Sequence, residues 1–336
     1  MSEGVAEADE DVEYFLEDIT FQGKSERTRD AYERVLGDFG AYLDSRDLSM
    51  DEANHRDCMA YIHQLRGDVA ESTVATYASY LHRFYDYMTR VGSFDENPMS
   101  LVVEEMDESI NTDPARRDIS VPAMRDFVAG ISHPLDRAVV VTLLKTGMRA
   151  GELCNLDTRD LYLADEDGAH RPRLDGRQDS LFVDDAPTAG SIYNEERRTA
   201  SNKRKRATTI PVDDELAAVL EDWLKIRPDP VSDADPLFVS TSDSWGGRLT
   251  PDMIHHKVET NAREAGWYRV GGGPEENVTP HYFRHFFTTH LRNRTGDRGV
   301  VKYLRGDVAT DVIDTYTHDW GDRIRTIYEA NIYSVC

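Results

Sequence analysis

Apolar residues in the amino-terminal part of the chain recur three and four positions apart, the spacing of one face of an α-helix. The pattern predicts helices over residues 12–19, 28–43, 51–65 and 72–91. Ser72 is a plausible N-cap for the fourth, and Gly92 can end it. Amphipathic helices of this length can close a small bundle. Before them, residues 1–10 are acidic and poor in apolar side chains, which predicts a disordered lead.

The pattern changes after the predicted bundle. Residues 94–118 mix proline, asparagine and charge around a short apolar patch, as interdomain linkers do. We therefore expect a helical domain over residues 11–93 and a second domain over residues 119–336. The second domain contains a nearly all-apolar run, typical of a buried helix, and two β-rich segments, at residues 180–183 and 208–212. The expected fold is mainly α with a small β-sheet (α+β).

One helix of the second domain has two chemically different faces. Thr279 suits its N-cap, Pro280 its first turn and Gly296 its carboxyl end. Helical spacing places one stripe toward the core, formed by Phe283, Phe286, Phe287, His290 and Leu291. The opposite face carries His281, Arg284, His285 and Thr288. A guanidinium fork beside an imidazole suits a bound anion.

The net charge of −24 argues at first sight against a nucleic-acid partner, because DNA binding normally requires cations. The charge is unevenly distributed, however. Residues 1–113 hold 9 Lys and Arg against 27 Asp and Glu, whereas residues 114–336 hold 30 against 36. Of the 39 basic residues only 7 are lysine, and the acidic residues are spread along the chain. We infer a halophilic source, since at 1 M salt electrostatic screening acts over about 3 Å.

A local exception to the acidic composition lies between the two predicted strands. No acidic residue occurs from position 197 to 212, and six basic residues fall within ten positions: Arg197, Arg198, Lys203, Arg204, Lys205 and Arg206. One interpretation is a solvated turn. The other is a loop that reaches a DNA groove, with Arg204 and Arg206 as contacts.

Several other classes of protein are disfavoured. The chain has no apolar run of the roughly 20 residues that span a membrane, and its acidic start is unlike a secretory signal, so a cytoplasmic location is expected. Cys58, Cys154 and Cys336 are far apart and form no C-x-x-C pair. His285 follows His281 at a spacing that zinc can use, but no third ligand with suitable spacing is found. Without a P-loop or an H-E-x-x-H motif, we expect no metal and no cofactor.

Two boxes of the second domain resemble those of the tyrosine recombinases, the phage integrase family of DNA breaking and joining enzymes. His281-x-x-Arg284, a hydrophobic helix, a turn and then Ile313-x-x-Tyr316-Thr-His resemble the carboxy-terminal box. Thr146-Gly147-x-Arg149-x-x-Glu152-Leu153 resembles the amino-terminal box. The earlier segments Ser25-x-x-Thr28-x-x-x-Tyr32, Ser72-Thr-x-x-x-Tyr77 and Asn97-Pro98 look like the family's helical core-binding (SAM-like) domain.

The resemblance implies a site-specific DNA recombinase that acts in integration, excision or inversion. In such a site Arg149, His281 and Arg284 would hold the scissile phosphate, and Tyr316 would form a covalent 3′-phosphotyrosine. The family's hairpin lysine, a general acid for the leaving 5′ hydroxyl, matches Lys203 best, with Lys205 as the runner-up. The partner implied is double-stranded DNA, with a homo-tetramer assembled on two sites.

The chain departs from the family at Asp307, nine residues before Tyr316, where histidine or tryptophan is usual. A carboxylate near a phosphate is repelled unless it is protonated or paired, and Arg305 is the nearest partner in sequence. We therefore expect slower cleavage than a histidine gives.

Alternative interpretations remain open at this point. A non-cleaving DNA-binding protein of the same ancestry fits Asp307 and the acidity, and a type IB topoisomerase would share the chemistry. A metal-dependent hydrolase is a more remote alternative. Tyr303, Tyr328 and Tyr333 compete with Tyr316 as nucleophile.

Overall fold

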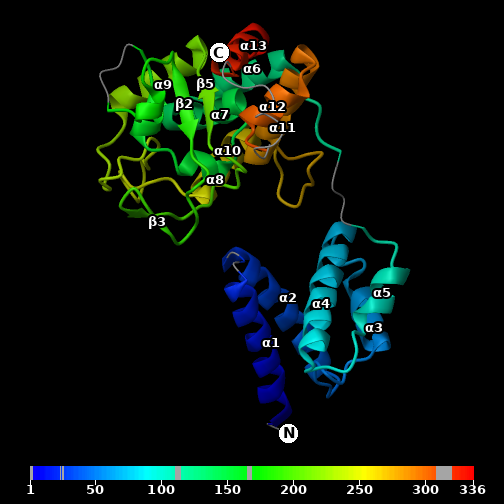
Figure 1. Cartoon of the computed structure of the whole chain (residues 1–336). Helices are drawn as coiled ribbons and strands as arrows, with labels where there is room; N and C mark the ends of the chain where they lie inside the picture. The colour runs from blue at the N-terminus through cyan, green and yellow to red at the C-terminus, as the bar shows by residue number, and fades with distance from the viewer. Residues whose placement is uncertain (1–2, 23, 25, 110–114, 165–168, 308–319) are drawn as a thin grey trace. The chain divides into compact units, whose positions relative to one another are not determined.

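The computed structural model describes residues 3–22, 24, 26–109, 115–164, 169–307 and 320–336. The chain divides into two compact units, Met1–Pro114 and Ala115–Cys336 (Figure 1). Each unit has its own buried apolar core. In the part of the chain that the structure describes, no helix is long and apolar enough to cross a membrane.

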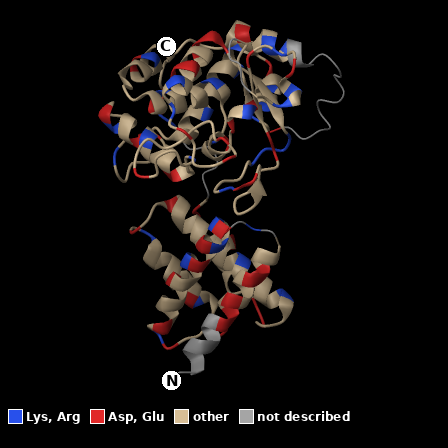
Figure 2. Cartoon of the chain, turned by 90° about the vertical axis from the view of Figure 1, so that its left-hand side faces the viewer, with Lys and Arg blue, Asp and Glu red and all other residues tan. Residues whose placement is uncertain are grey.

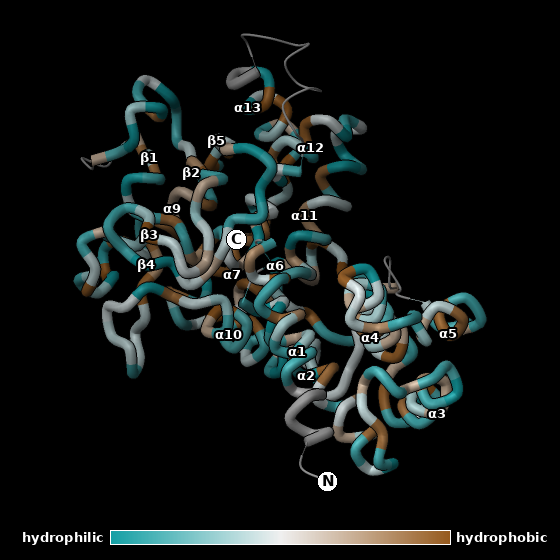
Figure 3. Tube along the Cα trace, turned by 60° about the horizontal axis from the view of Figure 1, so that its bottom comes forward, coloured by the Kyte–Doolittle hydropathy of each residue, from teal (hydrophilic) through white to brown (hydrophobic). Residues whose placement is uncertain are grey.

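The first unit is a helical bundle. Its helices are α1 (Glu3–Phe21), α2 (Glu26–Asp44), α3 (His55–Leu65), α4 (Glu71–Val91) and α5 (Met99–Glu105). Hydrophobic and hydrophilic residues alternate along these helices (Figure 3), as the sequence pattern predicts. The core is rich in aromatic rings that meet edge to face, including Phe15 and Phe84, whose centroids lie 5.3 Å apart. The predicted amphipathic bundle is therefore present.

Three local expectations in this unit differ from the structure. Helix α1 begins at Glu3, so most of the lead that was expected to be disordered is helical. Helix α5 lies within the segment expected to be a linker, and its Met99 and Val102 are buried in the bundle core. Helix α4 begins after Ala70 and not after Ser72. Acidic residues are spread over this unit's helices (Figure 2).

The second unit packs helices around two small sheets. Its helices are α6 (Val121–Gly130), α7 (Pro134–Thr146), α8 (Ala150–Cys154), α9 (Asp214–Ile226), α10 (Pro251–Glu264), α11 (Pro280–Thr295), α12 (Arg298–Leu304) and α13 (Trp320–Asn331), with short 3-10 turns at Thr158–Asp160 and Pro172–Leu174. An antiparallel sheet has the order β1 (Leu161–Tyr162), β2 (Ser180–Val183), β5 (Thr208–Pro211). The fold is thus mainly α with a small β component, as expected.

Helix α7 is the centre of the second unit, because it packs against α9 on one side and α11 on another. Its apolar run is buried throughout. It ends at Gly147, which has φ 61°. A Cβ atom at Gly147 would lie 2.3 Å from the Phe287 ring, so only glycine lets α11 approach this closely. This contact fixes where α11 begins relative to the end of α7.

A buried ammonium group ties the carboxyl-terminal residues to this core. The Nζ of Lys145 donates hydrogen bonds to Asp213 Oδ2 at 2.6 Å and to the carbonyl of Tyr333 at 2.7 Å, and Glu215 Oε2 lies 2.8 Å away. Lys145 is 0% exposed, and these oxygens compensate its charge. The hydroxyl of Tyr328 donates to the backbone carbonyl of Lys145. Helix α13 and the residues after it are therefore part of the core.

The connection between β2 and β5 is long and contains a small hairpin, β3 (Ile192–Tyr193) with β4 (Glu196–Arg197). The hairpin is anchored by Asp157, which is fully buried. Asp157 accepts hydrogen bonds from the guanidinium groups of Arg198, at 2.8 Å, and of Arg248, at 2.6 Å. One of the six basic residues of this loop, Arg198, therefore serves the fold.

Candidate functional site

Arginine side chains from distant parts of the second unit converge on the carboxylate of Asp307. Its Oδ1 accepts hydrogen bonds from Arg284 Nη2 at 2.7 Å and from Arg149 Nη2 at 3.1 Å. Its Oδ2 lies 2.9 Å from Arg305 Nε. The structure therefore brings together Arg149 and Arg284, the two arginines that the sequence assigned to one site.

Glu152 sets the position of Arg149. Arg149 immediately precedes α8, and its backbone N–H donates to Glu152 Oε2 at 2.9 Å. Its Nη1 donates to Glu152 Oε1 at 2.9 Å and to the carbonyl of Lys203 at 3.1 Å. Because Glu152 is fully buried, it holds the guanidinium in one orientation and leaves Nη2 for the anion. Arg149 therefore pairs with Glu152 through Nη1 and contacts the Asp307 carboxylate through Nη2 at the same time.

Arg284 lies on the second turn of α11 and is only 2% exposed, although the helical pattern predicted a face away from the core. Its Nη1 donates to the carbonyl of Gly147 at 2.6 Å, and its Nη2 also donates to the carbonyl of Arg305 at 3.1 Å. Burial, together with the nearby Arg149, lowers the pKa of Arg284 to about 10. The guanidinium remains a cation at neutral pH, held by main-chain oxygens.

The turn after α12 places Asp307. Gly306 adopts φ 69°, and the backbone N–H of Asp307 donates to the carbonyl of Lys302. The side chain of Arg204 packs against Gly306 so closely that a Cβ there would lie 2.7 Å from Arg204 Nη1. The backbone N–H of Lys205 donates to the carbonyl of Gly306 at 3.0 Å. The basic loop and the Asp307 turn are therefore positioned together.

The prediction that Arg204 contacts DNA does not fit the structure. The side chain is 0% exposed, and its Nη2 lies 3.2 Å from Glu152 Oε2. It also donates to the carbonyl of Leu304 at 3.2 Å. The sequence did not reveal this burial, because a run of basic residues does not show which of them point into the protein. Arg204 therefore contacts Glu152 and the end of α12 from inside the protein, and its side chain does not reach a duplex.

The remaining predicted cations of this loop are at the surface. Lys203 and Lys205 have exposed side chains on either side of buried Arg204. Arg206 is half-buried, with its guanidinium 5.4 Å from the centre of the Tyr303 ring. The carbonyl of Lys203 accepts a hydrogen bond from Arg149, and the amide of Lys205 donates to the carbonyl of Gly306, next to Asp307. Both lysines stay candidates for the general acid.

His281 lies on the first turn of α11, one turn before Arg284. Partial desolvation and the positive charges of Arg116, Arg284, Arg149 and Arg305 lower its pKa below the usual value for histidine. The imidazole is therefore neutral at pH 7. Arg116 and Arg305 were not assigned to the site from the sequence, because only folding brings them near His281.

Tyr316 lies outside the described residues, so its place relative to the cluster stays a prediction. Two of the tyrosines that compete with Tyr316 as the nucleophile are buried in the core. Tyr328 and Tyr333 are 0% and 1% exposed, and their hydroxyls donate to the carbonyls of Lys145 and Leu144. Tyr303 is half-buried and contacts Arg206.

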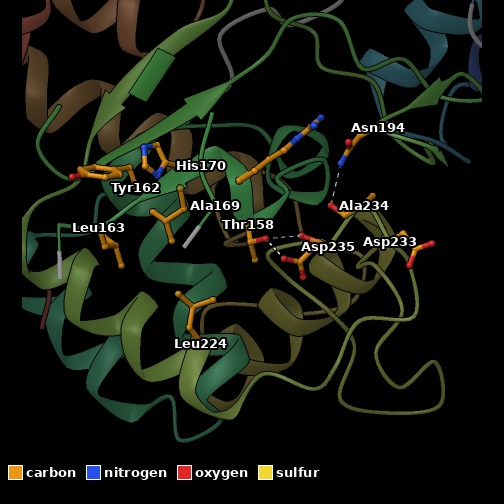
Figure 4. A pocket seen from close by; sticks show the side chains of 12 residues that line it. Thr158, Tyr162, Leu163, Ala169, His170, Asn194, Leu224, Asp233, Ala234 and Asp235 are labelled. Atoms are coloured by element: carbon orange, nitrogen blue, oxygen red, sulfur yellow. Dashed lines mark hydrogen bonds between the residues drawn. The ribbon is translucent and has the colours of Figure 1, made fainter. Parts of the chain in front are cut away.

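A separate pocket of about 480 Å³ lies beside β1 and α9 (Figure 4). Its lining includes Tyr162 and Leu224, and the carboxylates of Asp233 and Asp235. The Thr158 hydroxyl donates to Asp235. None of the predicted site residues lines this pocket.

Comparison with known proteins agrees with this architecture. Residues 122–321 match the Phage integrase family, and residues 12–92 match its N-terminal SAM-like domain. The chain is 23% identical to tyrosine recombinase XerC of Pelobacter propionicus over 92% of this chain and 90% of that one. It is 24% identical to tyrosine recombinase XerD of Shewanella oneidensis over 95% of each.

Solved structures share the fold. The Tn1549 transposon integrase, in complex with a circular intermediate DNA, superposes with a TM-score of 0.65 at 17% identity, covering 95% of this chain and 98% of that one. The XerH site-specific recombinase bound to a difH substrate gives 0.60 at 17% identity, covering 90% and 76%.

The family match and the similarity to curated recombinases along most of the chain place this protein in the class of the tyrosine-type recombinases. The chain belongs to the phage integrase family, the tyrosine recombinases.

Proposed function

We propose that this protein cuts and rejoins double-stranded DNA at specific sites through a covalent 3′-phosphotyrosine formed by Tyr316. Phosphoryl transfer depends mainly on positioning and on neutralising charge at the nonbridging oxygens. The convergence of Arg149 and Arg284 on one carboxylate oxygen carries the proposal, because two guanidinium groups oriented toward one point can bind a phosphate oxygen there.

The other roles follow from the surroundings of the two arginines. His281, neutral at pH 7, donates one hydrogen bond through its ring N–H to a phosphate oxygen. Lys203 or Lys205 protonates the leaving 5′ hydroxyl. The phosphotyrosine retains the energy of the phosphodiester, so a hydroxyl from a second strand can reverse the reaction without nucleotide or metal. Strand exchange between two sites implies four protomers, and the outcome is integration, excision or inversion.

A second candidate is a DNA-binding protein of the same ancestry that does not cleave. The same observation supports it, since a carboxylate in contact with both arginines opposes the approach of a phosphate.

A suicide substrate separates the two candidates. The substrate is a nicked duplex whose sequence is taken from the DNA that flanks the gene. It traps the covalent intermediate, which is seen as a protein–DNA band on a denaturing gel. We expect the band for the wild type and its loss in Tyr316→Phe. Tyr303→Phe is the matched control, since it removes a phenol hydroxyl from a tyrosine in the same unit and should leave the band. DNA retention in a native gel without any covalent band favours the non-cleaving candidate.

The general acid is assigned with a second pair of variants. Lys203→Ala and Lys205→Ala are compared on a phosphodiester and on a substrate with a 5′-thio leaving group, which needs no protonation. The variant that loses activity on the first substrate and keeps it on the second identifies the acid, and the other lysine serves as its control.

A further inference from the structure

The Asp307 carboxylate is held by more cationic groups than an ordinary ion pair. Both of its oxygens are engaged, Oδ1 by Arg149 and Arg284 and Oδ2 by Arg305. We propose that Asp307 is a built-in occupant of the anion site, which has to leave the two arginines before a phosphate binds there. This inference rests on the proposed function, in which Arg149 and Arg284 bind the scissile phosphate.

The chemistry of the two anions is similar at this point. A carboxylate presents two oxygens on one centre, as a phosphodiester presents two nonbridging oxygens, and guanidinium forks match both. Arg284 Nη2, at 2.7 Å, and Arg149 Nη2, at 3.1 Å, already point at one oxygen. They are therefore oriented for a phosphate oxygen at the place that Asp307 Oδ1 fills.

The two arginines have little freedom to serve both anions at once. Arg284 is 2% exposed and is held by the carbonyls of Gly147 and Arg305. Arg149 is held by Glu152, which is fully buried, and by the carbonyl of Lys203. Moving either guanidinium toward a second anion breaks these contacts. A phosphate beside the carboxylate would also repel it, so the two anions compete.

Asp307 can leave the site. Its side chain is 26% exposed and stands on a turn, and its third partner, Arg305, is 28% exposed. Asp307 can therefore move toward solvent while still paired with Arg305. The arrangement predicts two states of the site, one filled by carboxylate and one by phosphate. The apparent affinity for an external anion equals the intrinsic affinity multiplied by the fraction of molecules in which the site is empty.

Inorganic sulfate tests this without DNA. Sodium sulfate is titrated against sodium chloride at constant ionic strength, with the thermal unfolding midpoint and calorimetry as readouts. We expect Asp307→Asn to bind sulfate at least about tenfold more tightly than the wild type. Glu329→Gln is the matched control, because it also removes one carboxylate from an arginine ion pair, that with Arg325 at 2.8 Å. The control should stay within about twofold of the wild type.

Two further variants make the outcome decisive. Asp307→Ala also removes the carboxylate and leaves a smaller side chain in its place. If an Asp307 variant is unstable, its stabilisation by sulfate supports the proposal. Adding Arg149→Ala to Asp307→Asn should abolish the gain, which locates the sulfate. A sulfate-specific stabilisation of the wild type as large as that of Asp307→Asn would overturn the proposal, as would unchanged affinity in both Asp307 variants.

Failure here is distinguishable from failure of the proposed function. If Asp307→Asn gains no affinity for sulfate while the wild type forms the Tyr316 adduct, only the occupant role is lost. If sulfate binding follows the expectation and no adduct forms, the anion site stands and the cleavage proposal falls.

Discussion

The guanidinium of Arg284 and the carboxylate of Asp307 meet at 2.7 Å, although Arg284 is on α11 and Asp307 follows α12. Asp307 is the position at which this chain departs from the family pattern. The contact places it on a residue proposed to bind phosphate.

Replacing this carboxylate with an imidazole should accelerate strand cleavage. Asp307→His removes a negative charge beside the proposed phosphate site and supplies a hydrogen-bond donor. We expect adduct formation on the nicked suicide substrate to be at least about tenfold faster than in the wild type. Asp307→Asn separates the loss of charge from the gain of the imidazole. A large loss of activity in Asp307→His would contradict the interpretation of Asp307 as an obstacle.

Removing Glu152 should destabilise the second unit. The Arg204 side chain is 0% exposed, and its ion pair with Glu152 compensates a charge that has no access to water. Glu152→Ala leaves this cation and Arg149 without the carboxylate, at a cost of about 3–5 kcal/mol. Glu329→Ala, which breaks an exposed pair with Arg325, should cost less than about 1 kcal/mol. The free energy of unfolding from urea titration gives both values, and equal costs would refute a supporting role for Glu152.

Gly147 should not tolerate a side chain. Gly147→Ala places a Cβ within 2.3 Å of the Phe287 ring, in a backbone conformation that disfavours alanine. Gly190→Ala is the matched control, because Gly190 has φ 81° and no heavy atom within 4 Å of the added Cβ. The two variants share the conformational strain, so their difference measures the clash. We expect Gly147→Ala to be less stable than Gly190→Ala by about 1–3 kcal/mol. Equal unfolding midpoints would show that Phe287 moves aside freely.

The lowered pKa of His281 makes a pH-dependent contribution to stability. Above the unfolded-state pKa, about 6.5, the ring is neutral in both states and contributes no pH dependence. Below it, the unfolded chain binds the proton first, so stability is lost as pH falls toward the folded-state pKa. Replacing His281 with glutamine, which does not titrate, should flatten this acid limb. Urea midpoints between about pH 7.5 and 5 measure the slope. His290→Gln accounts for the other histidine of α11 whose pKa is lowered. An unchanged slope in His281→Gln would contradict the lowering of the His281 pKa by burial and by the nearby arginines.

The elements with strong local signals were predictable. Thr279, Pro280 and Gly296 marked α11 to within a residue, and the apolar run of α7 was found because it is buried on all sides. The acidic start of α1 and the polar, charged surroundings of α5 carry weak helical signals, so both segments differ from the expectation.

The pairing of the two arginines in one site was predictable, and their contacts were not. The spacing of the two boxes indicated Arg149 and Arg284. That Arg204 is buried on Glu152, and that Asp307 bridges Arg149 and Arg284, depends on residues far apart in the chain. Sequence patterns report local periodicity, and they carry no information on which long-range partner a charged side chain meets.

The buried Lys145 has a practical implication for handling the protein. Its ammonium depends on the carbonyl of Tyr333, and Glu215 also accepts from the backbone amide of Val335. Trimming residues 333–336 would remove the Tyr333 carbonyl from this buried ammonium and leave it with Asp213 and Glu215 alone. Affinity tags and reporter fusions are therefore better attached ahead of α1, where they leave this arrangement untouched.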